Sequence, residues 1–518
     1  MAAARKETRL ACGRGSRSRQ AETWTGRGNP RVLYVSDNLG VPTHARGIFN
    51  YSAGLLAGLA GLGARITLLV EARAGFGLPP KAEAALPREA AAVALLAEIY
   101  RFLASWSPDA PAPPAPEPKR PRWLARRTRR LRRLIAGLRR RDAPVRTRLI
   151  ANRPGQLDFL PPNLDHLGRV ETFMLAPKIY AEANDNAAQS RPAPRLDARG
   201  FEVVILDCPH HIRLVADPGA RVIGVVHDLI PLTDPEMDSG TRASFANRLG
   251  TMIAMAHHLV FVSETTRESF ARLYPDAAAR LGSSLVFPPL RGEALAAAQA
   301  MRPAAKVRED TPSFVAIVSD EGRKNIDRLI EAFVELGPVA RLVLIGGVGP
   351  RVRRRLADDP GAAHIHLTGF LTDAEKFAHL AAAAGVIVPS LSEGFGIPIV
   401  EGALFGRPVL CSDLPVFREI TGGHALFFDP HCTADIVRAL RERLADPPHL
   451  ACQAEALQRL CRASYGPDAT RRRLAAILGL PAIPDATATG LAPIEAAAPD
   501  ILAATEAPAL AAAEAPAA

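Results

Sequence analysis

Cysteine is scarce in this chain of 518 residues, and its spacing follows no pattern. None of the six cysteines forms a CxxC pair; they are Cys12, Cys208, Cys411, Cys432, Cys452 and Cys461. A disulfide framework and a clustered zinc site both need closer or repeated spacing, so neither is predicted. The composition fits a reducing compartment, and we expect no metal ligands.

Long apolar runs are also missing. A membrane-spanning helix needs roughly 20 consecutive apolar residues, and the best candidate, Leu55 to Val70, is broken by Arg65. Residues 1–30 are rich in arginine but lack the apolar core of a secretory signal, so we expect them to be a disordered basic extension or the result of a mis-assigned translation start. These absences predict a cytoplasmic protein.

Acidic residues are outnumbered, 53 against 64 lysines and arginines, which gives a formal net charge of +11. The excess lies in one segment: between Lys119 and Arg148 there are 14 basic residues and one acid, Asp142. This segment carries +13 and the remainder of the chain −2, so the basicity is a local property.

The basic segment has a helical pattern. Its apolar residues fall largely on one helical face; they are Trp123, Leu124, Leu131, Leu134, Ile135 and Leu138. Such a helix over 119–148 can lie at an anionic membrane surface on the inner face of the plasma membrane. The alternative is a solvated or disordered basic segment beside the first domain. Nucleic acid is not an expected partner, because no aromatic side chains interleave with the arginines.

Short strand-like runs alternate with longer helical patterns along most of the chain, which is typical of α/β domains with parallel sheets. The predicted strands include RVLYVSD, RITLLVEA, FEVVILD, RVIGVVHD and HLVFVS in the first half, and SFVAIVSD, RLVLIGG, HIHLTGF, GVIVPS and PVLCSD in the second. Two doubly wound domains in tandem place a crevice between the carboxyl ends of their sheets, where ligands bind in such folds.

The alternation predicts a first Rossmann-like domain over 31–290 with an insertion at about 75–200, a second over 311–465, and a helix over 466–480. The low complexity of 481–518 predicts a disordered Ala/Pro-rich tail.

The stretch SEGFGIPIVE holds two glutamates eight residues apart, Glu393 and Glu401. Between them, Gly394 and Gly396 permit unusual backbone torsions, and Pro398 suits the first turn of a helix. A helix N-terminus suits a phosphate, whereas carboxylates accept hydrogen bonds from hydroxyls. We therefore predict that Glu401 binds a ribose diol and that Glu393 binds a second sugar beyond a diphosphate.

Two cations precede this loop by about seventy residues, in the segment SDEGRKNIDRLIEAF. Arg323 and Lys324 follow a predicted strand directly, at the entrance to a helix. Arginine offers a fork of hydrogen-bond donors and lysine a compact charge, so together they can neutralise a departing nucleoside diphosphate without a metal ion.

With these motifs in this order, residues 311–465 resemble the donor-binding domain of the family 4 glycosyltransferases, which are retaining enzymes with the GT-B fold. EGFGIPIVE is similar to the family's E-x7-E signature, and DEGRKNIDRLIEAF to its phosphate-binding segment. In the first half, ARGIFNYSAGLLAGL resembles the first loop and helix, VIGVVHDLIPL the strand whose terminal histidine faces the donor sugar, and FVSETTRESF the interdomain strand and helix. The resemblance implies two Rossmann-like domains that face each other across a cleft, and a last helix, over 466–480, that returns to the first domain.

The resemblance also implies a role for each matching residue. The implied catalytic set is His227 at the reacting sugar, Arg323 and Lys324 on the diphosphate, and Glu393 on the donor sugar. The implied nucleotide-sugar contacts are Gly47, Gly394, Phe395, Gly396, Ile397 and Glu401. His210 and His211 are expected to be structural, and the nucleotide sugar is expected as a co-substrate without a further cofactor.

The implied activity is that of a retaining, metal-independent hexosyltransferase in bacterial polysaccharide or glycolipid biosynthesis, acting on a glycan or lipid-linked acceptor. GDP-mannose is the expected donor, because HDLIP and PVFREI resemble the variants of mannosyltransferase-like relatives. Two alternatives remain open. A sugar-nucleotide epimerase shares the fold and would need no acceptor, and a catalytically silent scaffold of a polysaccharide assembly complex would have no physical need for Arg323, Lys324, Glu393 and Glu401.

Overall fold

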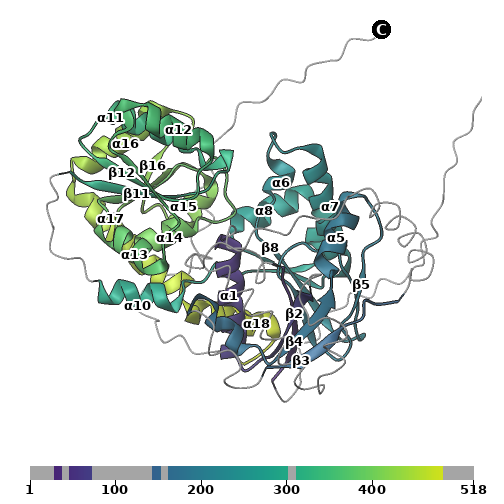
Figure 1. Cartoon of the computed structure of the whole chain (residues 1–518). Helices are drawn as coiled ribbons and strands as arrows, with labels where there is room; N and C mark the ends of the chain where they lie inside the picture. The colour runs from purple at the N-terminus through teal and green to yellow at the C-terminus, as the bar shows by residue number, and fades with distance from the viewer. Residues whose placement is uncertain (1–28, 38–45, 73–142, 153–161, 302–310, 482–518) are drawn as a thin grey trace, which may run out of the picture.

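The computed structural model describes residues 29–37, 46–72, 143–152, 162–301 and 311–481, and its two α/β domains lie side by side (Figure 1). The first domain is built on an eight-stranded sheet in the order β10-β9-β8-β6-β1-β2-β4-β3. The second is built on a six-stranded sheet in the order β13-β12-β11-β14-β15-β16. Both sheets are parallel apart from the edge pair β3–β4, which is antiparallel. This is the predicted α/β class.

The strands have the following bounds. The first sheet contains β1 (Arg31–Val35), β2 (Arg65–Ala72), β3 (Arg148–Ala151), β4 (Thr172–Pro177), β6 (Val203–Leu206), β8 (Arg221–Val226), β9 (His258–Phe261) and β10 (Gly282–Leu285). The second contains β11 (Ser313–Val318), β12 (Arg341–Gly346), β13 (Ile365–Gly369), β14 (Gly385–Val388), β15 (Val409–Ser412) and β16 (Leu426–Phe428). A separate parallel pair is formed by β5 (Arg195–Asp197) and β7 (Arg213–Val215).

The helices of the first domain are α1 (Arg46–Gly61), η3 (Pro162–Arg169), α5 (Ile179–Ala188), α6 (Ile230–Thr233), α7 (Ser239–Met255), α8 (Glu264–Leu273) and α9 (Pro275–Arg280). Those that follow are α10 (Gly292–Ala300), η4 (Gly322–Lys324), α11 (Ile326–Leu336), α12 (Pro350–Asp358), η5 (Pro360–Ala362), α13 (Asp373–Ala382), α14 (Ile397–Leu404), α15 (Pro415–Thr421), α16 (Thr433–Leu444), α17 (Pro448–Tyr465) and α18 (Pro467–Leu478). None of the described helices is both long and apolar enough to cross a lipid bilayer.

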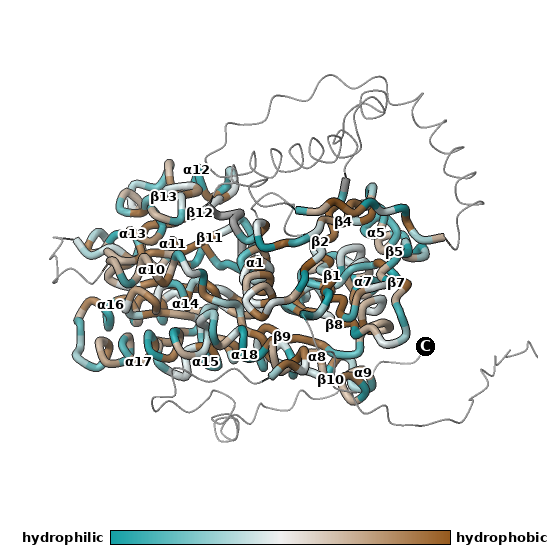
Figure 2. The backbone as a smooth tube through the Cα atoms, turned by 90° about the horizontal axis from the view of Figure 1, so that it is seen from below, coloured by the Kyte–Doolittle hydropathy of each residue, from teal (hydrophilic) through white to brown (hydrophobic). Residues whose placement is uncertain are grey.

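The strand sequences explain why the sheets are internal. All residues of β6, β14 and β15 are buried, as expected for parallel strands that are covered on both faces. Figure 2 shows brown, apolar residues along many strands, while teal, hydrophilic residues are frequent on the helices around them. The apolar runs of the sequence therefore form the sheet cores and place the strand ends at the domain junction.

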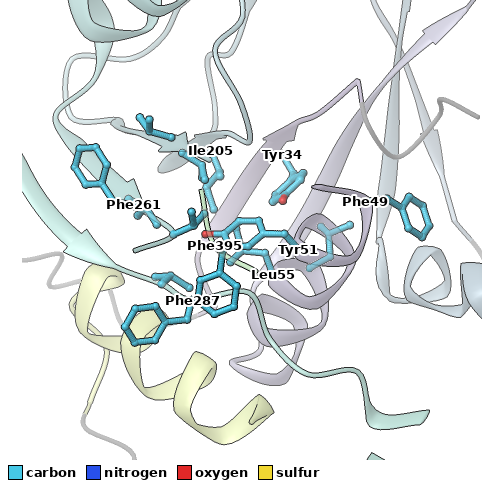
Figure 3. Close-up of a cluster of buried hydrophobic side chains, with 14 of the residues drawn as sticks. Tyr34, Phe49, Tyr51, Leu55, Ile205, Phe261, Phe287 and Phe395 are labelled. Atoms are coloured by element: carbon cyan, nitrogen blue, oxygen red, sulfur yellow. The ribbon is translucent and has the colours of Figure 1, made fainter. Parts of the chain in front are cut away.

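An aromatic cluster joins the two domains. The loop between β14 and α14, residues 389–396, is called the glycine-rich loop below. The ring of Phe287, which follows β10 of the first domain, lies 6.1 Å from the ring of Phe395 in this loop (Figure 3). Tyr465, at the end of α17, packs edge-on against both rings at 5.3 Å. Edge-to-face aromatic packing adds to the burial of apolar area, so the junction is a continuous core.

The last helix, α18, crosses back to the first domain and packs against α1. A Cβ atom placed on Gly58 of α1 would lie 2.8 Å from Leu474 of α18, so the two helices approach closely at this glycine. The chain thus passes between the domains twice, after β10 and again at Gly466.

Part of the predicted insertion at 75–200 belongs to the first sheet. β4 pairs in parallel with β2, and β3 continues the sheet beyond it. The basic helix predicted over 119–148 lies outside the described residues as far as residue 142, and its last residue, Arg148, begins β3. The predicted N-terminal extension, up to residue 28, and the C-terminal tail, from residue 482, also lie outside the described residues.

Candidate active site

Arg323 and Lys324 lie in the short turn η4 that follows β11, and Asn325 fixes this turn. Asn325 adopts a left-handed backbone conformation, with φ of 54°, and is buried. Its side-chain amide donates hydrogen bonds to the carbonyl oxygens of Pro389 (3.0 Å) and Pro430 (2.8 Å). Because β11 and β14 are parallel neighbours, their carboxyl ends meet at one edge, and Asn325 ties the cationic turn to the loop after β14.

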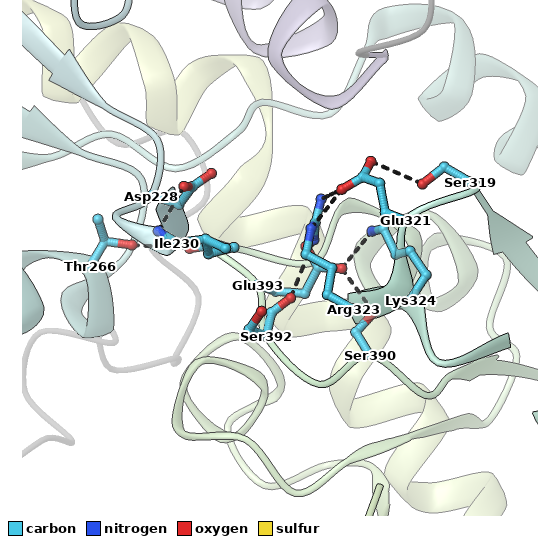
Figure 4. Close-up of polar contacts among 11 residues, drawn as sticks. Asp228, Ile230, Thr266, Ser319, Glu321, Arg323, Lys324, Ser390, Ser392 and Glu393 are labelled. Carbon is cyan, nitrogen blue, oxygen red and sulfur yellow. Dashed lines mark hydrogen bonds and ion pairs between the residues drawn. The ribbon is translucent and has the colours of Figure 1, made fainter. Parts of the chain in front are cut away.

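Glu393 lies between the two cations (Figure 4). Its Oε2 accepts a hydrogen bond from Arg323 at 2.9 Å, and its Oε1 accepts one from Lys324 Nζ at 2.5 Å. Ser390 Oγ donates a further hydrogen bond to Oε1 at 2.9 Å. Arg323 also donates to the carbonyl of Ser392 and to the more exposed Glu321. Three of the predicted site residues therefore form one cluster.

The cluster holds its charges because each is paired. Burial alone would raise the pKa of Glu393, but Lys324 and Arg323 outweigh it and lower that pKa below its ordinary value. Burial would lower the pKa of Arg323, but Glu393 and Glu321 raise it. The carboxylate is therefore ionised at neutral pH, and it holds the two cations in place.

We expect Glu393→Gln to destabilise the fold in a pH-dependent way. Because the pKa of Glu393 is lower in the folded state than the value of about 4.3 in unfolded chains, its stabilising contribution is present above that pH and is lost as the pH falls through the folded pKa. Thermal unfolding at pH 7 should show a loss of about 1–3 kcal/mol, which shrinks at acid pH.

The matched control is Glu321→Gln, since Glu321 is the exposed partner of the same arginine. An exposed ion pair contributes about 0–1 kcal/mol, so this variant should melt close to the wild type. A loss in Glu393→Gln that is equal at pH 7 and at pH 3.5 would contradict the ion-pair account.

The glycine-rich loop touches the first domain. A Cβ atom on Gly394 would lie 2.2 Å from the carbonyl oxygen of His227 and 2.8 Å from Asp228 Cβ, so only glycine fits there. Ser263 Oγ, before α8, donates a hydrogen bond to the Gly394 carbonyl at 2.8 Å. The loop that carries Glu393 is thus held by residues of both domains.

Glu419, on α15 of the second domain, caps α8 of the first. Its carboxylate accepts hydrogen bonds from the backbone N–H groups of Glu264 (2.6 Å) and Thr265 (2.9 Å) and from Thr265 Oγ1 (2.8 Å). These groups belong to the first turn of α8, whose N–H groups lack partners within the helix. Burial raises the pKa of Glu419. Glu419 was not among the predicted site residues, because a cap between distant segments leaves no local sequence signal.

His227 and Asp228 follow β8 and form the first-domain side of the contact with Gly394. His227 Nε2 lies 2.7 Å from the carbonyl oxygen of Asp207, and its ring packs edge-on against Tyr51. Burial raises the pKa of Asp228, whose Oδ1 accepts a hydrogen bond from the N–H of Ile230, the first residue of α6. Both residues stand beside the Glu393 loop, as expected for residues at the carboxyl end of a parallel strand.

Gly47 and Ile397 also face each other between the domains. A Cβ atom on Gly47, in the first turn of α1, would lie 3.6 Å from Ile397 Cδ1. Gly396 precedes Ile397 with φ of 145°, and a Cβ atom there would meet Phe417 and Ile420. The chain therefore needs glycine at 396 to turn into α14.

Two of the predicted contact residues, Phe395 and Glu401, have buried side chains. The Phe395 side chain is buried in the aromatic cluster, so its backbone alone is left for a ligand. Glu401 is also buried and pairs with Lys376 of α13, with 2.7 Å between its Oε1 and Nζ. It shares no hydrogen bond with the Arg323 cluster. Lys376 was missed in the sequence because nothing in the pattern of α13 marks it as an ion-pair partner.

Within the described residues, one group of side chains has metal-ligand spacing, namely Asp37, Cys208 and His210. Cys208 Sγ lies 3.5 Å from Asp37 Oδ1 and 3.3 Å from His210 Nε2, and hydrogen bonds account for both contacts. Burial and the neighbouring carboxylates raise the pKa of the Cys208 thiol well above its ordinary value, which favours the protonated thiol. The metal independence of the protein stays a prediction.

Comparison with known proteins finds a family match in the second domain and relatives over part of the chain. Residues 298–459 match the family model described as glycosyl transferases group 1. The chain is 30% identical over 257 residues to the serotype-specific mannosyltransferase WbdA of Escherichia coli, over 44% of this chain and 30% of WbdA. It is 28% identical over 241 residues to the O-antigen chain mannosyltransferase B of Escherichia coli, over 44% of this chain and 62% of that protein. The chain thus spans less than two thirds of the length of these relatives.

Solved structures resemble the whole two-domain architecture. Sucrose-phosphate synthase from Thermosynechococcus elongatus superposes with a TM-score of 0.50 at 14% identity, over 87% of this chain and 98% of that chain. Anabaena HepE in complex with UDP superposes with a TM-score of 0.51 at 12% identity, over 86% of this chain and 99% of that one. Likeness at this identity concerns the fold, and it confirms the predicted pair of Rossmann-like domains.

Proposed function

Because residues 298–459 match the glycosyl transferases group 1 family and the chain has the GT-B fold, we propose that it transfers a sugar from a nucleotide-sugar donor to a glycan or lipid-linked acceptor. The observation that carries the proposal is the cluster of Arg323, Lys324 and Glu393. It stands where two neighbouring parallel strands end and where the first domain touches the loop, which is the usual place for a ligand in such sheets.

The two cations are assigned to the diphosphate. As the bond between the sugar and the diphosphate breaks, negative charge grows on the departing phosphate oxygens. Arg323 and Lys324 are already held in place by Glu393, Ser392 and Asn325, so they can stabilise this charge without a costly rearrangement. This arrangement supports catalysis without a metal ion.

Glu393 and His227 are assigned to the transferred sugar. Ionised Glu393 can accept hydrogen bonds from sugar hydroxyls, and His227 stands across the domain contact from the loop that carries it. We assign the acceptor to the first-domain side of this contact, where attack on the face that the diphosphate leaves would retain the anomeric configuration. Contact between the domains excludes water and so limits hydrolysis of the donor.

Mannose from GDP-mannose is the proposed donor sugar, and assembly of a bacterial surface polysaccharide or glycolipid is the proposed context. Support comes from the names of three relatives: a serotype-specific mannosyltransferase, an O-antigen chain mannosyltransferase and, in Mycobacterium leprae, a phosphatidyl-myo-inositol mannosyltransferase with 31% identity over 150 residues. A lipid-linked acceptor agrees with peripheral attachment to the inner membrane face through the basic segment 119–148.

The first test is calorimetric titration of the wild type with GDP, UDP and ADP, followed by the matching sugar nucleotides. We expect one nucleotide to bind clearly better than the others and Glu401→Ala to weaken it by about 10- to 100-fold, the effect of losing a hydrogen bond to a charged acceptor.

The same titrations separate the alternatives. If none of the three nucleotides binds at millimolar concentration, the enzymatic proposal fails and a silent scaffold is favoured. Conversion of the sugar nucleotide to its epimer in the absence of any acceptor would instead identify an epimerase.

A further inference from the structure

The buried ammonium group of Lys376 lies between two carboxylates. Lys376 is 6% exposed, and its Nζ stands 2.7 Å from Glu401 Oε1 and 3.1 Å from Asp373 Oδ1. A capping box formed by Thr372 and Glu375 fixes the first turn of α13, and this turn places Asp373 and Lys376 on one face of the helix.

The network continues into the segment that links the domains. Asp373 Oδ2 lies 2.6 Å from Arg291, the residue before α10. Positive and negative charges therefore alternate along the series Arg291, Asp373, Lys376 and Glu401. Burial would lower the pKa of Lys376, but Glu401 and Asp373 raise it, and burial would raise the pKa of Asp373, but Lys376 and Arg291 lower it. Lys376 and Asp373 thus keep their charges at neutral pH.

Lys376 pairs with one of the two carboxylate oxygens of Glu401. In the part of the chain that the structure describes, Lys376 is its hydrogen-bonding partner, and the contact is made through Oε1. The pair fixes the rotation of the side chain one helical turn into α14, behind the glycine-rich loop. The second oxygen, Oε2, is left as an acceptor for hydroxyl groups.

We propose that Lys376 is a positioning residue, which holds Glu401 in the orientation that accepts the hydroxyls of the nucleotide ribose. The inference rests on the proposed function, because it assumes a nucleoside diphosphate in this site. Lys376 itself does not touch the nucleotide.

Packing alone does not account for this lysine. Phe377 of α13 and Phe405, directly after α14, already pack 5.6 Å apart between the same two helices. A buried ion pair is often no more stabilising than apolar side chains of similar volume, so a second apolar contact would join α13 and α14 equally well. Unlike an apolar contact, the ion pair between Lys376 and Glu401 also orients the Glu401 carboxylate.

The experiment compares GDP with 2′-deoxy-GDP by calorimetry, or UDP with 2′-deoxy-UDP if the wild type binds UDP instead. The wild type should bind the ribonucleotide about tenfold more tightly than the deoxynucleotide. Lys376→Met keeps the unbranched stem but removes the charge. It should weaken binding of the ribonucleotide about tenfold and leave binding of the deoxynucleotide within about threefold of the wild type, so that the preference is lost.

A variant cycle with Glu401→Gln separates positioning from stability. If Lys376 acts through Glu401, Lys376→Met should not change the preference further in the Glu401→Gln background. Equal weakening of both nucleotides, in both backgrounds, would mean that Lys376 only stabilises the domain and would overturn the proposal. Arg459→Ala on the exposed face of α17 serves as the control and should bind both nucleotides as the wild type does.

Two further results would overturn the inference. If Lys376→Met does not fold, Lys376→Leu takes its place, since leucine also removes the hydrogen bond to Glu401; an unchanged ribose preference in this variant contradicts positioning. A wild type that binds both nucleotides equally has no ribose subsite at Glu401, although the proposed function would stand. Absence of any nucleotide binding would instead be a failure of the proposed function.

Discussion

Replacing Lys324 with methionine should lower kcat/KM for sugar transfer by about 10²- to 10³-fold, the usual effect of removing one group that stabilises charge in a transition state. Lys324 Nζ lies 2.5 Å from Glu393 Oε1, at the position where the diphosphate is expected. Methionine retains most of the lysine stem, and Glu393 keeps Arg323 and Ser390 as partners. The loss should therefore appear in the chemistry more than in the fold. Steady-state kinetics at saturating acceptor would measure it.

The control for this variant is Arg438→Ala, which also removes one cation from the second domain. Arg438 lies on α16 in exposed ion pairs with Asp435 and Glu442, and exposed pairs contribute little. Its kcat/KM should stay within about twofold of the wild type. A Lys324→Met enzyme that retains a third or more of wild-type activity would remove Lys324 from the diphosphate site.

A single added methyl group at Gly394 should reduce transfer by more than about 100-fold, because the domains can no longer make their contact. The new Cβ atom would lie 2.2 Å from the carbonyl oxygen of His227, and a backbone oxygen cannot rotate away as a side chain could. Overpacking in a rigid contact forces the backbone to shift. Here the clash is between two domains, so a shift of one domain away from the other relieves it, at the expense of the aromatic packing that joins them.

This variant should separate nucleotide binding from transfer. Binding of GDP to Gly394→Ala, measured by calorimetry, should change much less than the rate of transfer, and small-angle scattering should show a larger radius of gyration. Gly250→Ala on α7 is the matched control, since a Cβ atom there meets nothing within 4 Å. Transfer at the wild-type rate by Gly394→Ala would mean that the contact with His227 is not part of the reacting state.

The sequence identified Arg323, Lys324 and Glu393 as candidates but not as partners. It assigned the cations to a phosphate and the carboxylate to a sugar, and it could not give the distance between them. That distance depends on β11 and β14 being neighbours in the sheet and on Asn325 tying the two loops together. Strand order and a side-chain bridge across 64 residues are properties of the tertiary fold, so the pattern of either segment alone did not contain them.

Other features could not be predicted from the sequence, because they also depend on contacts between distant elements. Phe395 is a member of a motif associated with ligand contacts, yet its ring completes a core with Phe287 and Tyr465. Glu419 and Lys376 find their partners on other elements, at α8 and at α14. The periodic apolar runs predicted the strands well, because a strand buried on both faces must be apolar wherever it lies.

The packing of α18 against α1 also has a consequence for synthesis on the ribosome. The first domain begins at β1, but one of the helices that cover α1 is α18 (Pro467–Leu478), more than 400 residues later in the chain. Until these residues emerge, the nascent chain exposes the face of α1 around Gly58 to solvent and to chaperones. The N-terminal half is therefore translated first but completed last, and a transcript that stops before codon 467 would yield a chain whose second domain can fold while its first remains open.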